Sequence, residues 1–191
     1  MTQKNLSSPV LLGAGSRHGD RLTLLGEAVR LLASRGLRVA LFSSVWETEP
    51  VGLPKGPPLL NGALALEAAL PPEAVLAACL EVERVMGRSR SPLPLPGRPD
   101  PGHRPIDLDL LLAGPAVLDL PGLSLPHPRL HQRRFVLEPL AEIAPRAVHP
   151  VLRRDIASLL RDCPDRSWVR RFASAEAWRA AASLQPGEQS G

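Results

Sequence analysis

The chain has 191 residues with a formal net charge of +4, and 44% of its residues are hydrophobic and 22% charged. This length suits one domain with a tail better than two full domains, and the composition excludes a disordered, collagen-like or low-complexity chain. Proline supplies 22 residues and aromatic residues only 3% of the chain, so we expect numerous stiff loops.

The apolar runs, the cysteines and the basic residues indicate where the protein is located and what it binds. No apolar run reaches the about 18 residues needed to span a bilayer, and residues 1–15 lack a signal peptide pattern, so we expect a cytoplasmic protein without a membrane partner. Cys79 and Cys163 are isolated, which predicts buried free thiols. All basic residues except Lys4 and Lys55 are arginines, whose planar charged groups suit phosphate oxygens.

The first half of the chain predicts a strand, a helix, two strands and a second helix. Residues 19–36 carry leucines at helical spacing, with Asp20 to cap the helix and Gly36 to end it. By the same criteria and by alternation we expect strands over 9–14, 37–50 and 59–67, and a helix over 72–86.

The second half begins with a long loop, because residues 91–105 include six prolines. Residues 104–120 then predict a strand, a Gly-Pro turn and another strand. We expect a loop with short helical pieces over 124–145, a helix over 154–161, and a segment from 167 that starts helical and becomes disordered. We therefore divide the chain into one domain, 1–165, and a C-terminal extension, 166–191.

Asp107 and Asp109 are the most informative residues. In a strand these two carboxylates share one face, with Cα atoms about 6.5–7 Å apart. Two like charges in an apolar strand favour a bound cation, and two magnesium ions bridged to phosphate oxygens satisfy both charge and geometry. The alternative is a polar surface stripe paired with arginines.

Several arginines lie near this pair in sequence and favour a metal-bound polyphosphate. Arg88, Arg90 and Arg104 flank the proline loop, and Arg133 and Arg134 follow the strand pair.

Two common nucleotide motifs do not fit. GxxxxGK[ST] is absent, which excludes a P-loop kinase. Gly13, Gly15 and Gly19 lie between a strand and a helix, but the third glycine comes one residue too late for a dinucleotide fingerprint.

Six ordered segments carry a family resemblance: GSRHGDR (15–21), SSVWETEPVG (43–52), LLN (59–61), EVERVMGRSR (81–90), RPIDLDLLL (104–112) and LPHPRLHQRRFVLEPLAEIAP (125–145). Together they closely resemble the 6-hydroxymethyl-7,8-dihydropterin pyrophosphokinases of folate synthesis, over about residues 9–161. The resemblance implies a ferredoxin-like α+β fold, an antiparallel sheet with helices packed on its faces. It also implies transfer of the β,γ-diphosphate of ATP to the pterin hydroxymethyl oxygen, with release of AMP.

The resemblance also implies roles for individual residues. Asp107 and Asp109 match the residues that hold two Mg²⁺ ions, and Arg88 and Arg104 those that contact the transferring phosphates. The nucleotide side is matched by Glu83, Arg90, Ile106, Leu110, Ser124, His127 and Arg133. For Glu83 the alternative to this role is an exposed carboxylate on the second helix. The pterin side is matched by Thr48, Glu49, Pro50, Val51, Leu59, Asn61 and Phe135.

The sequence departs from the family pattern at three places. Leu59 stands where the family usually places an aromatic residue, so we expect Phe135 alone to stack on the pterin. Arg17 and His18 differ from the family's first turn, so we expect that turn to be reshaped. The loop 91–103 has no Trp; we expect it to close as a lid, with a stiff surface insertion as the alternative.

Two other functions stay open at this point. The net charge permits an arginine-rich protein that binds nucleic acid, although the sequence is poor in aromatic stacking residues and lacks helix-turn-helix, RRM and zinc patterns. A catalytically impaired relative of the family is supported only by the altered loop. We expect a monomer that acts on two small molecules, ATP and the reduced pterin alcohol, without nucleic acid.

Overall fold

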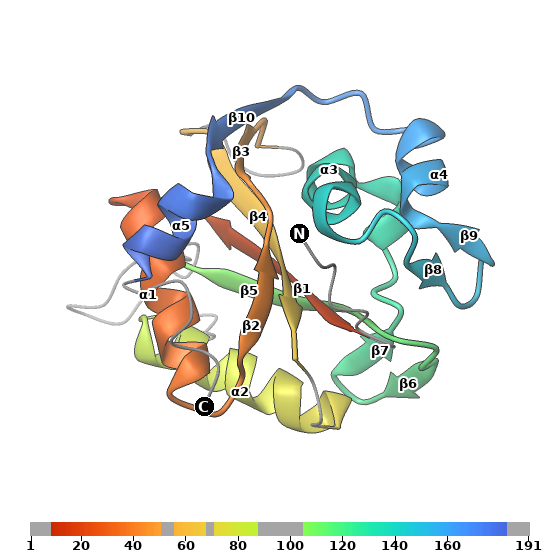
Figure 1. The fold of residues 1–191 in the computed structure, drawn as a ribbon, viewed down its shortest axis with the longest axis horizontal. Helices are drawn as coiled ribbons and strands as arrows, with labels where there is room; N and C mark the ends of the chain where they lie inside the picture. Colours follow the sequence, from red (N-terminus) through yellow and green to blue (C-terminus); the bar gives the residue numbers. More distant parts are fainter. Residues whose placement is uncertain (1–8, 51–55, 68–70, 88–104, 183–191) are drawn as a thin grey trace.

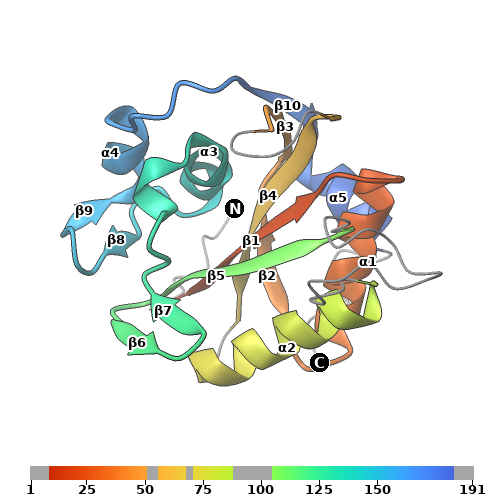
Figure 2. The same cartoon turned by 180° about the vertical axis from the view of Figure 1, so that it is seen from behind.

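A computed structural model describes residues 9–50, 56–67, 71–87 and 105–182, and confirms the predicted α+β class (Figures 1 and 2). Its main sheet has the strand order β10-β3-β4-β1-β5, with β2 also paired to β4, and every pairing is antiparallel. The strands are β1 (Val10–Ser16), β2 (Val39–Phe42), β3 (Val45–Thr48), β4 (Leu59–Leu66), β5 (Asp107–Ala113) and β10 (Val169–Ala173).

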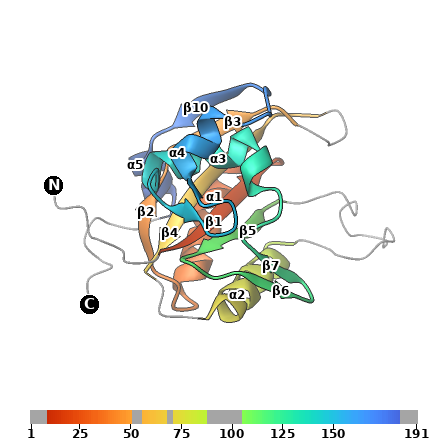
Figure 3. The same cartoon turned by 90° about the vertical axis from the view of Figure 1, so that its right-hand side faces the viewer.

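Helices cover both faces of this sheet. One core cluster joins it to α1 (Arg21–Ala33), α2 (Pro72–Val85) and α5 (Ala175–Ala181), and a second cluster joins it to α3 (Arg134–Ile143) and α4 (Ile156–Arg161). None of the described helices is long and apolar enough to cross a membrane. The smaller elements are η1 (Leu130–Gln132) and two hairpins. One hairpin, labelled in Figure 3, pairs β6 (Leu118–Leu120) with β7 (Leu123–Leu125), and the other, labelled in Figures 1 and 2, pairs β8 (Val148–His149) with β9 (Arg154–Asp155).

Local sequence signals account for the first two helices. The Asp20 carboxylate accepts a hydrogen bond from the Thr23 backbone N–H at 3.2 Å and caps α1, as predicted. Gly36 follows α1 with a φ of 80°, a conformation that suits glycine. Pro72 begins α2, which ends before Gly87.

The single strand expected over 37–50 is wrong, because Ser43 and Ser44 divide it into β2 and β3. Both halves pair with β4. The Ser44 backbone N–H and hydroxyl donate to the Glu142 carboxylate at 3.0 and 2.7 Å, and the Trp46 indole N–H donates to it at 3.3 Å. A carboxylate at the end of α3 therefore fixes the break between the two strands.

The expectation that the segment from 167 starts helical is wrong, because the segment begins with the strand β10 and the helix α5 follows it. Trp178 on α5 is fully buried and packs edge-on against Phe42, with ring centroids 5.5 Å apart. A Cβ on Gly62 would lie 2.4 Å from the Trp178 ring, so only glycine admits it. The division at residue 165 stays a prediction, although the elements after it pack into the core of the sheet.

The remaining differences lie between β5 and α4. The second strand of the predicted pair is β6, and the loop expected over 124–145 contains α3, one of the helices that cover the sheet. The helix expected from Arg154 begins at Ile156, because Arg154 pairs with His149 in the β8–β9 hairpin. Cys79 and Cys163 are free and buried, as predicted.

Candidate active site

One row of residues crosses three strands on a single face of the sheet. Gly15 on β1 lies opposite Asp107 on β5 and opposite Asn61 on β4. Directly opposed residues direct their side chains to the same face, so the side chains of Asp107 and Asn61 lie on one face of the sheet, on either side of Gly15. Asp109, two residues along β5 and opposite Gly13, shares this face, as the alternation of the strand predicted.

Gly15 makes room for the Asn61 side chain at the centre of this row. A Cβ at Gly15 would lie 2.8 Å from Oδ1 of Asn61, so the glycine allows the Asn61 amide to lie over β1. Asn61 and Asp107 are two strand spacings apart, about 9–10 Å. A β1 side chain at position 15 would displace the Asn61 amide from this position.

The Asn61 amide is held in one orientation. Its Nδ2 donates to the Thr48 hydroxyl at 2.7 Å, and both residues are buried. Leu59, half-buried, lies opposite Thr48 in the β3–β4 pairing. Three of the residues expected on the pterin side are thus next to one another on the sheet.

Two basic side chains, Arg133 and His127, interact electrostatically with the aspartates. Burial lowers the pKa of Arg133, as does the charge of Arg129, while Asp109 and Asp107 act in the opposite direction. Burial also lowers the pKa of His127, against the charge of Asp109 and together with Arg133 and Arg129. These mutual effects place Asp107, Asp109, His127 and Arg133 in a single site.

Two backbone contacts hold His127 beside β5. Its backbone N–H donates to the Leu111 carbonyl at 2.9 Å. Its Nδ1 accepts from the Arg129 backbone N–H at 3.2 Å, so the neutral ring carries its proton on Nε2. With a lowered pKa, His127 is a neutral hydrogen-bond donor at pH 7.

Phe135 lies under one of these cations. The Arg133 guanidinium carbon is 5.5 Å from the centre of the Phe135 ring, and Phe135 packs against the second core cluster. The stacking surface expected for the pterin is therefore next to a residue expected at the triphosphate.

Glu83 has a position that the sequence did not predict. It is 1% exposed, so the alternative of an exposed helix carboxylate is wrong. Its Oε1 accepts from the backbone N–H of Leu108, the residue between the two aspartates, at 2.9 Å. On the other side of β5, the Ser16 hydroxyl donates to the Pro105 carbonyl at 2.7 Å. These two contacts fix the start of β5, and a nucleotide role for Glu83 stays a prediction.

The other expected nucleotide residues divide into two groups. Ile106 and Leu110 are buried in the core cluster that contains α1, α2 and α5, so their side chains do not join the aspartates. Ser124 and His127 line a cavity of about 320 Å³, together with Leu118, His131 and His149 among others. The Ser124 hydroxyl donates to Asp119 at 3.1 Å.

Some expected residues lie outside the described part of the chain: Val51, Arg88, Arg90, Arg104 and the loop 91–103. Glu49 and Pro50 are described and follow β3, where the Glu49 backbone N–H donates to the Trp168 carbonyl at 3.3 Å.

Sequence reasoning missed Arg129, although it lies within the LPHPRL segment, and it tested Gly13 and Gly15 only as part of a dinucleotide motif. The described residues contain no group of three or more His, Cys, Asp or Glu side chains arranged for a metal. A cation at Asp107 and Asp109 therefore needs further oxygen ligands, which phosphates and water supply for magnesium.

Comparisons with known proteins match the chain to one enzyme family. A family model described as 7,8-dihydro-6-hydroxymethylpterin-pyrophosphokinase (HPPK) matches residues 11–145. A 2-amino-4-hydroxy-6-hydroxymethyldihydropteridine pyrophosphokinase of Porphyromonas gingivalis is 39% identical over 146 residues, which cover 74% of this chain and 93% of that protein. A protein of the same name from Bacillus subtilis is 38% identical over 133 residues, 69% of this chain and 75% of the relative.

Solved structures share the fold. A structure described as HPPK-DHPS in complex with substrates has a TM-score of 0.60 at 14% identity, and covers 81% of this chain and 43% of that one. Wild-type Plasmodium falciparum HPPK-DHPS has a TM-score of 0.60 at 13% identity, with 81% and 44% covered. The chain thus spans less than half of these solved chains.

Proposed function

The chain belongs to the 7,8-dihydro-6-hydroxymethylpterin-pyrophosphokinase family, and from its site we propose how it transfers diphosphate from ATP to the pterin hydroxymethyl oxygen. It is a pterin pyrophosphokinase of folate synthesis, an ATP-dependent transferase. The observation that carries the residue assignment is the row of Asp107, Gly15 and Asn61 across the sheet.

The pterin lies against the Asn61 amide, on the face of the sheet that also carries Asp107. A primary amide both donates and accepts hydrogen bonds, which matches the alternating donors and acceptors on a pterin edge. The contact with Thr48 sets the direction in which the Asn61 amide faces. Phe135 supplies the stacking surface, and backbone groups from Thr48 to Val51 read the ring.

The triphosphate lies against the basic side chains that interact with the aspartates. Arg133 stays charged at all relevant pH values and contacts phosphate oxygens, and His127 donates from Nε2. Arg88, Arg90 and Arg104 complete this set, with Ser124 on the nucleotide side. The pairing of Arg133 with Phe135 keeps the guanidinium in place before the nucleotide arrives.

Asp107 and Asp109 hold two Mg²⁺ ions. Two carboxylates on one face, without a third protein ligand among the described residues, suit a cation that also takes phosphate oxygens and water. When bound, the ions offset the negative charge of the triphosphate and of the transition state. Because both carboxylates stand on the same strand, Asp107 and Asp109 would hold the ions from one face of β5.

The reaction needs no covalent enzyme intermediate. The pterin oxygen bonds to the β-phosphorus, the bond from that phosphorus to the α,β-bridging oxygen breaks, and AMP leaves as the hydroxyl proton is lost. The protein contributes by aligning the two substrates on opposite ends of the row and by surrounding the phosphates with cations.

Incubation with ATP, Mg²⁺ and the reduced pterin alcohol tests the proposal, with AMP and the pterin diphosphate measured by chromatography. We expect AMP only when the pterin is present. Formation of ADP, or hydrolysis that does not depend on the pterin, would contradict it. A catalytically impaired relative would bind both substrates without forming AMP.

A further inference from the structure

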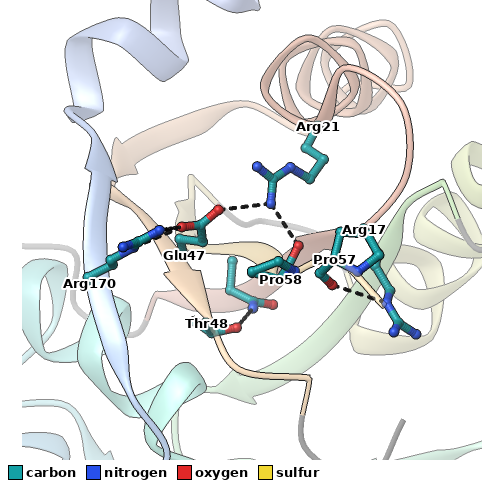
Figure 4. Close-up of polar contacts among 8 residues, drawn as sticks. Arg17, Arg21, Glu47, Thr48, Pro57, Pro58 and Arg170 are labelled. Atoms are coloured by element: carbon teal, nitrogen blue, oxygen red, sulfur yellow. Dashed lines mark hydrogen bonds and ion pairs between the residues drawn. The ribbon is translucent and has the colours of Figure 1, made fainter. Parts of the chain in front are cut away.

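We infer that Glu47, held between Arg21 and Arg170, positions the pterin side of the site, and that strand β10 thereby supports substrate binding (Figure 4). The inference rests on the proposed function. It concerns residues on the opposite face of the sheet from the substrates, and Arg170 lies beyond the family match at 11–145.

Glu47 is a buried carboxylate with two cationic partners. It is 6% exposed, and its oxygens accept from Arg21 Nη1 at 3.1 Å and from Arg170 Nε at 2.8 Å, with a second contact to Arg170 Nη2. Burial alone would raise the pKa of Glu47, but the hydrogen bonds and charges of Arg170 and Arg21 outweigh burial and hold it below its usual value. Glu47 is therefore ionised, and it joins α1 to β10 through β3.

The same network holds the chain that enters β4. Arg21 Nη1, which binds Glu47, also donates to the Pro58 carbonyl at 2.7 Å. Arg17 Nε donates to the Pro57 carbonyl at 3.4 Å. Figure 4 shows both arginines reaching toward this segment. The end of β3 and the start of β4 are thus tied to one guanidinium group.

Strand β10 pairs with β3 on the edge of β3 that faces away from β4. Arg170 lies opposite Glu47 and Val169 opposite Thr48 in the β10–β3 pairing. The Glu49 backbone N–H donates to the Trp168 carbonyl at 3.3 Å, which extends the pairing past the end of β3. Phe172 lies under Arg21, with the guanidinium carbon 5.6 Å from the ring centre.

The network reaches the substrate face through the alternation of β3. Glu47 faces α1, whereas its neighbour Thr48 faces the opposite side and accepts the hydrogen bond from Asn61. A shift of β3 therefore moves Thr48 and Asn61 together. The aspartates on β5 are two strands further from β3 than Asn61, so the effect falls on the pterin rather than on the triphosphate.

The test compares Arg170→Ala with Arg171→Ala. Both residues are largely exposed and adjacent on β10, but Arg171 contacts Glu142 and Trp46 on the other face. Calorimetry measures the Kd of the pterin alcohol in the presence of a non-hydrolysable ATP analogue, and the Kd of the analogue alone. We expect Arg170→Ala to weaken pterin binding about tenfold and analogue binding less than about twofold. Arg171→Ala should match wild type, and Arg170→Lys should recover part of the loss.

The outcomes separate the two proposals. A wild-type protein that binds no pterin overturns the proposed function and this inference with it. A wild-type protein that binds pterin, with Arg170→Ala binding it equally well, overturns the inference alone, as does an equal loss of affinity for both ligands. If Arg170→Ala fails to fold, Glu47→Gln takes its place, because glutamine keeps the shape and removes only the charge that the arginines hold.

Discussion

Four ionisable side chains meet at the centre of the site: Asp107, Asp109, His127 and Arg133. Asp109 favours the protonated forms of His127 and Arg133, while Arg129 and burial disfavour them. The result is a neutral imidazole beside a charged guanidinium, opposite two carboxylates. Such a site binds a triphosphate together with its magnesium ions more readily than it binds the triphosphate alone or the ions alone.

Replacing either aspartate tests the metal role. Asp107→Asn or Asp109→Asn should lower pterin-dependent AMP formation by about 100-fold or more, because an amide cannot replace a charged oxygen ligand. The melting temperature should change little, since the variants remove one of two like charges. Asp162→Asn, which alters a surface ion pair with Arg154, is the matched control. A folded double variant with near-normal rates would exclude the metal role.

The aromatic face gives a second prediction. Phe135→Ala should weaken pterin binding far more than ATP binding, because it removes the stacking surface while Arg133 keeps its charge. Leu59→Tyr should strengthen pterin binding by adding a second aromatic surface beside Thr48. Titrations of each ligand with the two variants measure these effects. Unchanged pterin affinity in both variants would refute the assignment.

Among the elements, α5 tests whether the C-terminal segment stabilises the domain. Trp178→Ala should lower the free energy of unfolding by about 3–5 kcal/mol, because it empties a fully buried site against Phe42 and Gly62. Removal of the residues after Leu184 should leave both stability and activity unchanged. Denaturant unfolding measures both variants. Equal stability of Trp178→Ala and wild type would show that α5 does not hold the sheet.

Elements marked by local signals could be predicted from the sequence, and those formed by distant contacts could not. Asp20 and Gly36 delimit α1 within a few residues along the chain. The break at Ser43 and Ser44 depends on Glu142, about a hundred residues away. Strand β10 lies in a stretch rich in Ala and Arg that suggests helix, and it forms a strand because β3 offers a partner edge.

The same division applies to the site. Alternation along β5 is a local rule, so the shared face of Asp107 and Asp109 could be predicted. The position of Asn61 across Gly15 depends on the β4–β1 register, which residue patterns alone do not determine. Glu83 follows Val75 and Cys79 at helical spacing, which indicates the buried face of α2. Its contact with Leu108 depends on the packing of α2 on β5, which the spacing does not determine.

At the scale of the whole molecule, two histidines tie stability to pH. Burial lowers the pKa of both His127 and His149, and His149 is 5% exposed with its Nδ1 accepting from the Leu152 backbone N–H. A lowered pKa means that the unfolded chain binds more protons. The stabilising contribution is therefore complete above about pH 6.5 and is lost as the pH falls through the folded pKa.

We expect the melting temperature to fall between pH 7 and pH 5.5, by about 2–4 °C for each kcal/mol lost. His149→Gln should show a smaller fall, because glutamine still accepts from Leu152 and does not titrate. Thermal unfolding at a series of pH values compares the two proteins. Parallel curves would show that His149 does not contribute to the pH dependence.

The order of strands in the sheet also bears on how the protein is made. β3 is synthesised early, yet its outer partner, β10, leaves the ribosome more than a hundred residues later. Until then the nascent chain exposes an unpaired strand edge and an open hydrophobic hollow at Gly62, where Trp178 later inserts. The sheet is therefore completed only after translation has passed residue 178, and until then the outer edge of β3 is open to pairing with other strands.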